Sequence, residues 1–170
     1  LTNTVASLIV SGANGRMQAG QTYSVWNFNE EVLARRISRQ TWSPEQSRQL
    51  AGLCVQFLRS HRFEKQTRLP AAVAEMHKAL RPAKPITILI FSDGDDRIEG
   101  TVFDRSINLV YQEKGRDARR ARKPIITAFV GQEGRLVAWA VSVAQTRALE
   151  SRTWSMRMCT GSWKPAPARV

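Results

Sequence analysis

Apolar residues recur along this chain with two different periods, one typical of helices and one typical of strands. Helical spacing is found near the N-terminus, where Val5, Leu8 and Ile9 line one face, although a strand over residues 5–10 is a competing interpretation. A proline follows two of the later helical patterns, and its ring and missing N–H prevent a helix from continuing. The same spacing predicts three more helices, at residues 43–60, 68–80 and 101–123.

The helix predicted at residues 43–60 begins with a clear N-terminal signal. Ser43 is a favoured N-cap residue, Pro44 suits the first helical position, and Gln46 stands three residues after the cap. Cys54 falls in the apolar stripe of this helix, so its thiol is expected in the core.

Strands are predicted where β-branched and aromatic residues cluster between turn signals. Residues 22–28 have this composition, and residues 30–37 are a short candidate partner. Residues 86–91 form a continuous apolar run, which is typical of a strand covered on both faces in a parallel sheet. Two further strands are close enough for a hairpin, at residues 125–130 and 135–143. Alternating helices and strands predict an α/β layered fold.

Composition limits the organisation and the partners of the chain. With 170 residues and 42% hydrophobic residues we expect one core, in a domain over residues 1–143 followed by an irregular basic tail over residues 144–170. The 26 Lys and Arg residues against 14 Asp and Glu give a net charge of +12, which attracts polyanions without selecting one. The two Cys and two His residues argue against a zinc site, and no apolar run is long enough to cross a bilayer.

The candidate chemistry follows the apolar run at residues 86–91, where the sequence continues as Ser92-Asp93-Gly94-Asp95-Asp96. Clustered carboxylates repel each other unless they face water, a cation or hydrogen-bond donors. In parallel α/β sheets ligands bind at the carboxyl ends of strands, so we expect a site here. The alternative is that Asp93 only caps the loop by accepting hydrogen bonds from backbone N–H groups.

The order of the segments "YSVWNFNEEV", "SPEQ…FLRS", "EKQTRLPAAVAEM" and "ITILIFSDGDD" resembles a von Willebrand factor type A domain. The resemblance covers residues 1–143 and implies a Rossmann-like three-layer sandwich with a mostly parallel central sheet. In that sheet residues 22–28, 86–91 and 125–130 would lie together. Nothing in the chain matches the first strand of the family or its Asp-x-Ser-x-Ser loop, so we expect an N-terminally truncated domain.

The resemblance also implies a metal site. Type A domains often hold Mg²⁺ at a metal-ion-dependent adhesion site, and two of its ligands have counterparts here, Thr67 and Asp93. The Asp-x-Ser-x-Ser ligands have none. Two protein oxygens make a poor site for an ion that dehydrates reluctantly, so we expect weak or absent Mg²⁺ binding.

The function implied by the resemblance is a non-enzymatic protein-binding or scaffolding module with an incomplete metal-ion-dependent adhesion site. Its partner would be another protein. Loss of a central strand would leave apolar strand edges exposed, which predicts a marginally stable or self-associating chain.

Two other functions remain open from the residues. Asp93 and Asp95 have the spacing of the catalytic pair of Mg²⁺-dependent haloacid-dehalogenase-like phosphotransferases, with Thr101 in a supporting role, but that family has its nucleophile strand early in the domain. The second alternative is nonspecific nucleic-acid binding through the basic surface, including residues 116–123. A solvated helix end also explains that basic run, and no nucleic-acid-binding motif accompanies it.

Overall fold

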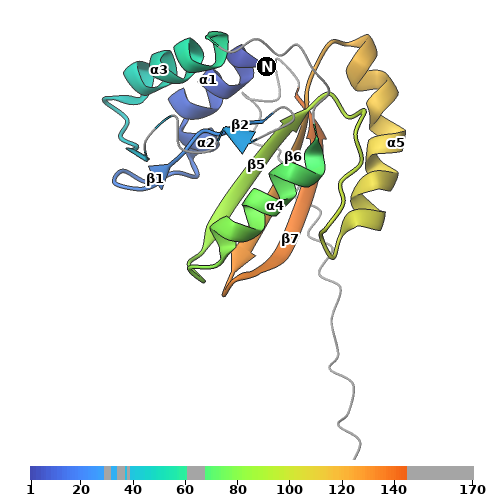
Figure 1. Ribbon diagram of the computed structural model, residues 1–170. Helices are drawn as coiled ribbons and strands as arrows, with labels where there is room; N and C mark the ends of the chain where they lie inside the picture. Colours follow the sequence, from blue (N-terminus) through green and yellow to red (C-terminus); the bar gives the residue numbers. More distant parts are fainter. Residues whose placement is uncertain (29–31, 34–36, 38, 61–67, 145–170) are drawn as a thin grey trace, which may run out of the picture.

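The computed structural model describes residues 1–28, 32–33, 37, 39–60 and 68–144, which form a mixed α/β fold (Figure 1). The predicted tail therefore lies almost entirely outside the described residues. The described elements are, in chain order, α1 (Thr2–Val10), α2 (Gly12–Gly15), β1 (Thr22–Tyr23), β2 (Asn27–Phe28), β3 (Val32–Leu33), β4 (Gln40–Thr41), α3 (Ser47–Arg59), α4 (Leu69–Leu80), β5 (Ile86–Ser92), α5 (Asp104–Arg120), β6 (Ile125–Gln132) and β7 (Arg135–Val143).

The main sheet has the order β5-β6-β7, and both of its pairings are antiparallel. β5 pairs with β6 along its whole length, from Ile86 opposite Gly131 to Ser92 opposite Ile125. β6 and β7 form the predicted hairpin, with a bulge between Val130 and Gly131. The prediction of a parallel, Rossmann-like sheet is therefore wrong for the described strands.

The antiparallel direction of β6 follows from the segment between β5 and α5. In a parallel β-α-β unit the helix brings the chain back to the starting edge of the sheet. Here residues 93–103 make that return instead, running back alongside α5 before the helix begins (Figure 1). α5 then carries the chain forward again, so β6 must run opposite to β5.

Side chains of two helices hold this return segment in place. Asn108 of α5 accepts a hydrogen bond from the backbone N–H of Ile98 at 2.9 Å and donates one to the Ile98 carbonyl at 2.8 Å. Asp104, the first residue of α5, accepts hydrogen bonds from the backbone N–H groups of Gly100 and Thr101, both at 2.8 Å, and so ties the end of the return segment to the helix. His77 of α4 donates to the Gly100 carbonyl at 2.8 Å.

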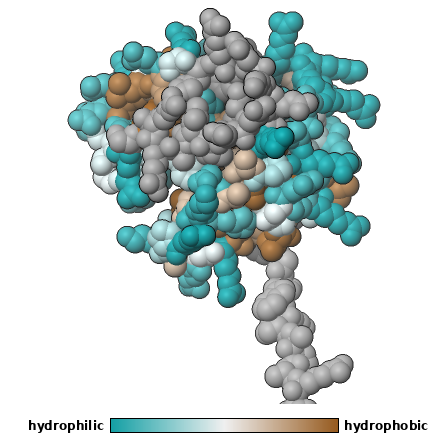
Figure 2. Space-filling model, viewed as in Figure 1, coloured by the Kyte–Doolittle hydropathy of each residue, from teal (hydrophilic) through white to brown (hydrophobic). Residues whose placement is uncertain are grey.

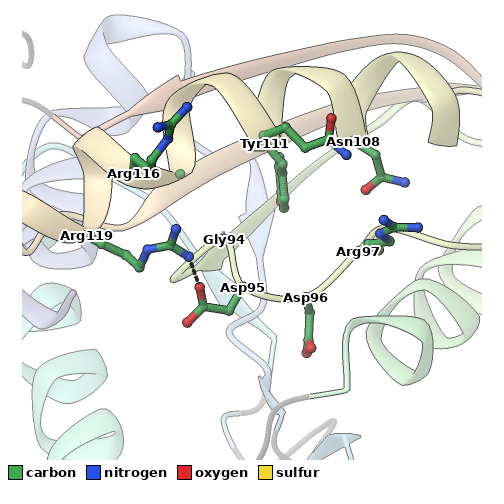
Figure 3. Close-up of a pocket in the computed structure, with 10 residues that line it drawn as sticks. Gly94, Asp95, Asp96, Arg97, Asn108, Tyr111, Arg116 and Arg119 are labelled. Carbon is green, nitrogen blue, oxygen red and sulfur yellow. Dashed lines mark hydrogen bonds and ion pairs between the residues drawn. The ribbon is translucent and has the colours of Figure 1, made fainter.

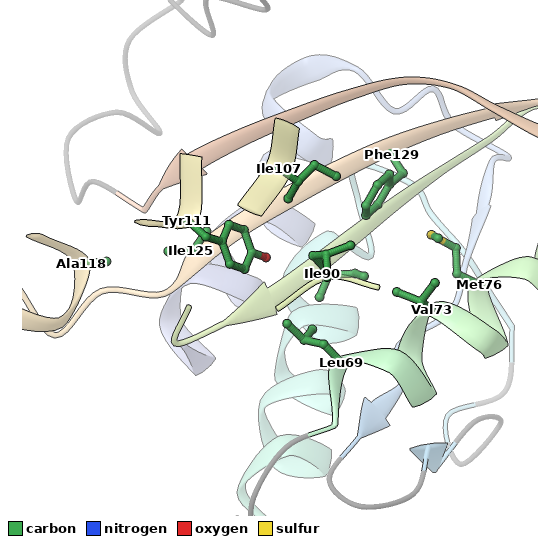
Figure 4. Close-up of a cluster of buried hydrophobic side chains, with 10 residues drawn as sticks. Leu69, Val73, Met76, Ile90, Ile107, Tyr111, Ala118, Ile125 and Phe129 are labelled. Atoms are coloured by element: carbon green, nitrogen blue, oxygen red, sulfur yellow. The ribbon is translucent and has the colours of Figure 1, made fainter. Parts of the chain in front are cut away.

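The sheet cluster is the main hydrophobic core, where α4 and α5 pack against the face of the sheet that carries Ile90 and Phe129 (Figure 4). Phe129 is 0% exposed, and Ile98 of the return segment is equally buried in this core. Helical periodicity predicted α4 and α5, because their buried residues recur at i, i+4 and i+7 in α4 and at i, i+4 and i+11 in α5. The helices contribute Leu69, Val73 and Met76 from α4 and Ile107, Tyr111 and Ala118 from α5.

The N-terminal cluster is a second, smaller core between α1 and α3. Trp42 joins it and donates its indole N–H to the Ile9 carbonyl at 2.8 Å. Cys54 is 1% exposed there, which confirms its predicted place in the core. α3 begins at Ser47 rather than Pro44, although the Ser43 hydroxyl does accept a hydrogen bond from the Gln46 N–H at 3.3 Å.

The strand predicted at residues 22–28 is divided into two short pieces. β1 pairs with β4 and β2 pairs with β3, each in an antiparallel ladder of two residues. Neither ladder joins the main sheet, so the expectation that residues 22–28 lie in one sheet with β5 is wrong. Across the described part of the chain, no helix is both long and apolar enough to cross a membrane.

Candidate functional site

A polar cavity of about 320 Å³ lies between residues 94–97, just beyond the end of β5, and one face of α5 (Figure 3). From α5 the lining extends from Asn108 to Arg119, at positions spaced i, i+3, i+4, i+7, i+8 and i+11, which is the spacing of a single helix face. The loop lies antiparallel to the helix, because Asp95 meets Arg119 while Ile98 meets Asn108. The cavity is thus a site with one loop wall and one helix wall.

Gly94 allows the loop to pack closely against the sheet, whereas Gly115 faces Gly94 with room to spare. Gly94 has φ +84°, and a Cβ atom built on it would lie 2.4 Å from Cδ1 of Ile125 in the sheet. A Cβ atom at Gly115 of α5 would lie 3.8 Å from the Gly94 carbonyl oxygen, an ordinary contact distance. Gly94 is therefore required both by its left-handed backbone and by the side chain beneath it.

Asp93, the residue predicted as a metal ligand, has a structural role in this loop. Its carboxylate accepts a hydrogen bond from the backbone N–H of Asp95 at 3.1 Å, which is an Asx-turn. This is the kind of hydrogen bond that the loop-capping alternative predicted for Asp93. Thr67, the other predicted ligand, lies outside the described residues.

No metal-binding group is found at this loop. Across the described ranges, no cluster of three or more His, Cys, Asp or Glu side chains could hold a metal ion. The carboxylates of the loop have other partners instead: Asp95 forms an ion pair with Arg119, and Asp96 is also engaged in an interaction. The Asp95 and Arg119 side chains are 58% and 50% exposed, so water screens this pair and it contributes little to stability.

The floor of the cavity carries a chain of buried hydroxyl groups. The Tyr111 and Thr127 hydroxyls lie 2.7 Å apart and share a hydrogen bond, and the Ser92 hydroxyl lies 3.4 Å from that of Tyr111. Burial raises the pKa of Tyr111 above its usual value, and the nearby charge of Asp93 adds to this effect. The phenol is therefore protonated at neutral pH and held in one orientation.

Two arginines leave the cavity with uncompensated positive charge. Within the described residues, neither Arg97 nor Arg116 has a carboxylate partner. Figure 3 shows Arg97 beside Asn108 at one end of the cavity and Arg116 beside Arg119 at the other. Hydrophilic side chains also dominate the side of the molecule occupied by α5 (Figure 2). The available charge of the site is therefore cationic and divided between its two ends.

The sequence indicated the loop half of this site but not the helix half. Asp95 belongs to the predicted carboxylate cluster, whereas Asn108, Gln112 and Arg116 were not identified. A signal for them exists, since polar residues at 108, 112, 116 and 119 repeat at helical spacing beside the buried stripe of α5. That spacing places these residues on one helix face, but it does not predict which segment packs beside that face.

The residues that line the cavity limit which ligands it can bind. The carboxylates have partners, the phenol is protonated, and the guanidinium groups at the two ends are available to a ligand. This arrangement can bind anionic groups without a metal ion. No model of a known protein family, no curated protein and no solved structure matches this chain.

Proposed function

We propose that this chain is a non-enzymatic binding module that engages another protein through the cavity between residues 94–97 and α5. The observation that carries the proposal is a preformed polar cavity with two uncompensated arginines, Arg97 and Arg116. The protein-binding role itself comes from the resemblance of the segment order to type A domains, although the parallel sheet of that family is not found among the described strands. The cavity begins just after the end of β5, whatever the direction of the neighbouring strands.

The protonation and bonding of the site residues favour binding over catalysis. A general base needs a pKa near the working pH and access to the substrate proton. Tyr111 instead has a raised pKa and a hydrogen bond to Thr127, and Asp95 is paired with Arg119. The phosphotransferase alternative would use Asp93 as the nucleophile, and one oxygen of this carboxylate accepts the Asp95 N–H.

The proposal can be tested by NMR with the ¹⁵N-labelled chain and short peptides of acidic, basic and neutral composition. We expect shifts in the backbone amides of Gly94 and Gly115 and in the side-chain amides of Asn108 and Gln112, because all four line the cavity. The side-chain amide of Asn14 serves as control, because it lies in the N-terminal half. The absence of shifts with every peptide would refute the proposal, as would phosphatase activity that disappears in Asp93→Asn.

Nucleic-acid binding is a second candidate, and the exposed basic side chains of α5 favour it. Arg120 and Arg122 continue the positive charge of Arg116 and Arg119 beyond the cavity. A nonspecific polyanion responds to total charge rather than to the cavity. Arg116→Gln and Arg120→Gln would then weaken oligonucleotide binding equally, with the steep salt dependence of counterion release.

A further inference from the structure

We propose that the cavity binds an extended acidic peptide segment of about five residues, with one acidic side chain at each end. This inference rests on the proposed function and specifies the chemistry of its partner. The occupant is a segment of another protein, and charge complementarity is the reason for choosing an acidic one. A basic peptide does not fit the division of charge described below, and a nucleic acid is the competing occupant that the test distinguishes.

The length of the cavity sets the length of the segment. The lining face of α5 extends from Asn108 to Arg119, which is about 16 Å at the helical rise of about 1.5 Å per residue. An extended peptide advances about 3.3 Å per residue, so about five residues cover this distance.

The two ends of the cavity select for acidic side chains at separate positions. Arg97 stands at the Asn108 end, and Arg116 stands at the Arg119 end (Figure 3). A guanidinium can bind a carboxylate through two parallel hydrogen bonds, which adds geometry to the charge attraction. Asp95 is paired with Arg119 and Asp96 has an interaction of its own, so the arginines at the two ends are the charged groups that a ligand carboxylate can reach.

The middle of the cavity suits a peptide backbone rather than a third charge. Gln112 is exposed, and its amide can both donate and accept hydrogen bonds. Gly115 is buried against the Gly94 backbone, so it adds no polar or charged side chain to the middle of the cavity. The Tyr111 hydroxyl is already bonded to Thr127, so it closes the floor without recruiting a polar group from the ligand.

The walls are held in place before a ligand arrives. The Asx-turn at Asp93 and the paired hydrogen bonds between Asn108 and Ile98 fix both ends of the loop wall. Binding then needs little ordering of the protein, and the affinity depends mainly on the two arginines.

The test uses fluorescence anisotropy with labelled peptides and the full chain. The probe is Glu-Ser-Gly-Ser-Glu with blocked termini, and the matched peptide Glu-Glu-Ser-Gly-Ser has the same composition with adjacent acidic residues. We expect the spaced peptide to bind about tenfold more tightly, since only it reaches both arginines. Equal affinity of the two peptides would overturn the inference.

Substitutions on the protein provide the second arm. Arg97→Gln and Arg116→Gln should each weaken binding of the spaced peptide about tenfold, and circular dichroism checks that each variant is folded. Arg120→Gln is the matched control, because it removes the same charge one helical turn away on an exposed position outside the cavity. An equal loss in Arg120→Gln, or an oligothymidylate that competes fully for the probe, would identify a nonspecific polyanion surface and overturn the inference.

The failure of this inference can be distinguished from failure of the proposed function. Cavity shifts caused by neutral or basic peptides, without preference for the spaced acidic probe, would refute the acidic segment and leave the protein-binding module in place. If no peptide shifts the cavity residues, both proposals are refuted.

Discussion

The sheet cluster and the N-terminal cluster both bury apolar side chains, but different contacts hold them together. In the sheet cluster β6 pairs along its full length with strands on both sides, and α4 and α5 cover one face of the sheet. In the N-terminal cluster the strands form ladders of two residues, and the packing of α1 against α3 supplies most of the contacts. The cavity belongs wholly to the sheet cluster. The candidate site therefore lies on the part of the molecule with continuous backbone pairing.

The comparison predicts that the largest losses of stability come from the sheet cluster. Phe129→Ala removes a ring that is 0% exposed, and we expect it to lower the free energy of unfolding by about 3–5 kcal/mol. Leu50→Ala in the N-terminal cluster should cost about 2–3 kcal/mol, because its site is nearer the surface and can relax. Urea denaturation measures both. Equal losses would mean that the two clusters are equally well packed.

The next largest effect concerns the contact between the loop and the sheet. Gly94→Ala places a Cβ atom against Ile125 and strains a residue with φ +84°, so we expect a loss of about 2–3 kcal/mol. Gly15→Ala is the matched control, because Gly15 has φ +77° but nothing within 4 Å of the added atom. It should cost only about 1 kcal/mol. A similar cost at both positions would show that Ile125 gives way and that the loop wall is not fixed.

The two tyrosines of the chain, one in each cluster, give a smaller and sharper contrast. Tyr111→Phe leaves the buried Thr127 hydroxyl without its partner, so we expect a loss of about 1–2 kcal/mol. The buried Tyr23 hydroxyl lies beside the Cys54 thiol, a weak hydrogen-bonding group, and makes no well-formed hydrogen bond to any described residue, so Tyr23→Phe should be neutral or slightly stabilising. Thermal denaturation of the two variants measures this difference. A clear loss in Tyr23→Phe would reveal a partner for that hydroxyl.

The same tyrosines predict how stability responds to alkaline pH. Burial raises the pKa of both above the unfolded value of about 10. Below that pH both states keep the phenol protons, so the free energy of unfolding does not depend on these groups. Above it the unfolded chain releases protons that the folded chain retains, so stability falls as pH rises. In the variant with both Tyr23→Phe and Tyr111→Phe, the free energy of unfolding should decline less steeply between about pH 9.5 and pH 11. Urea denaturation at intervals of about half a pH unit measures this decline.

The smallest expected effect is that of Mg²⁺. Asp93 is occupied by the Asp95 N–H, so we expect millimolar Mg²⁺ to leave the melting temperature unchanged and calorimetry to show weak or no binding. Micromolar binding that disappears in Asp93→Ala would contradict this and restore the adhesion-site interpretation.

The sequence predicted elements whose causes are local and failed where distant contacts decide. The helices α4 and α5 and the β6–β7 hairpin follow from apolar spacing and turn residues. The direction of β6 depends on the return segment, which is held by Asn108 and His77 from other elements. Residues 22–28 have strand composition, but two different partners divide them into β1 and β2.

The candidate site was predicted to the same extent and for the same reason. The carboxylates after β5 stand out because they interrupt an apolar run, so the loop wall was identified. The sequence left the role of Asp93 open between metal ligand and loop cap, because the hydrogen bond from the Asp95 N–H is visible only in the fold. Arg116 could not be told from Arg120 by sequence, because only packing shows which of them lines the cavity.

The antiparallel pairing of β5 with β6 also determines when the site can form. The β6–β7 hairpin closes over a short stretch of chain. Pairing of β5 with β6 closes a longer one, because β6 begins 33 positions after the last residue of β5 (125 − 92). Closing the longer loop costs more chain entropy, so we expect the hairpin to fold first and β5 to dock afterwards. Because Gly94 rests on Ile125, the cavity walls assemble only after that docking. On a ribosome, the site would therefore not form until β6 has left the exit tunnel. The order can be checked by comparing the folding and unfolding rates of Ile88→Val in β5 with those of Val141→Ala in β7. We expect the β5 substitution to change mainly the unfolding rate.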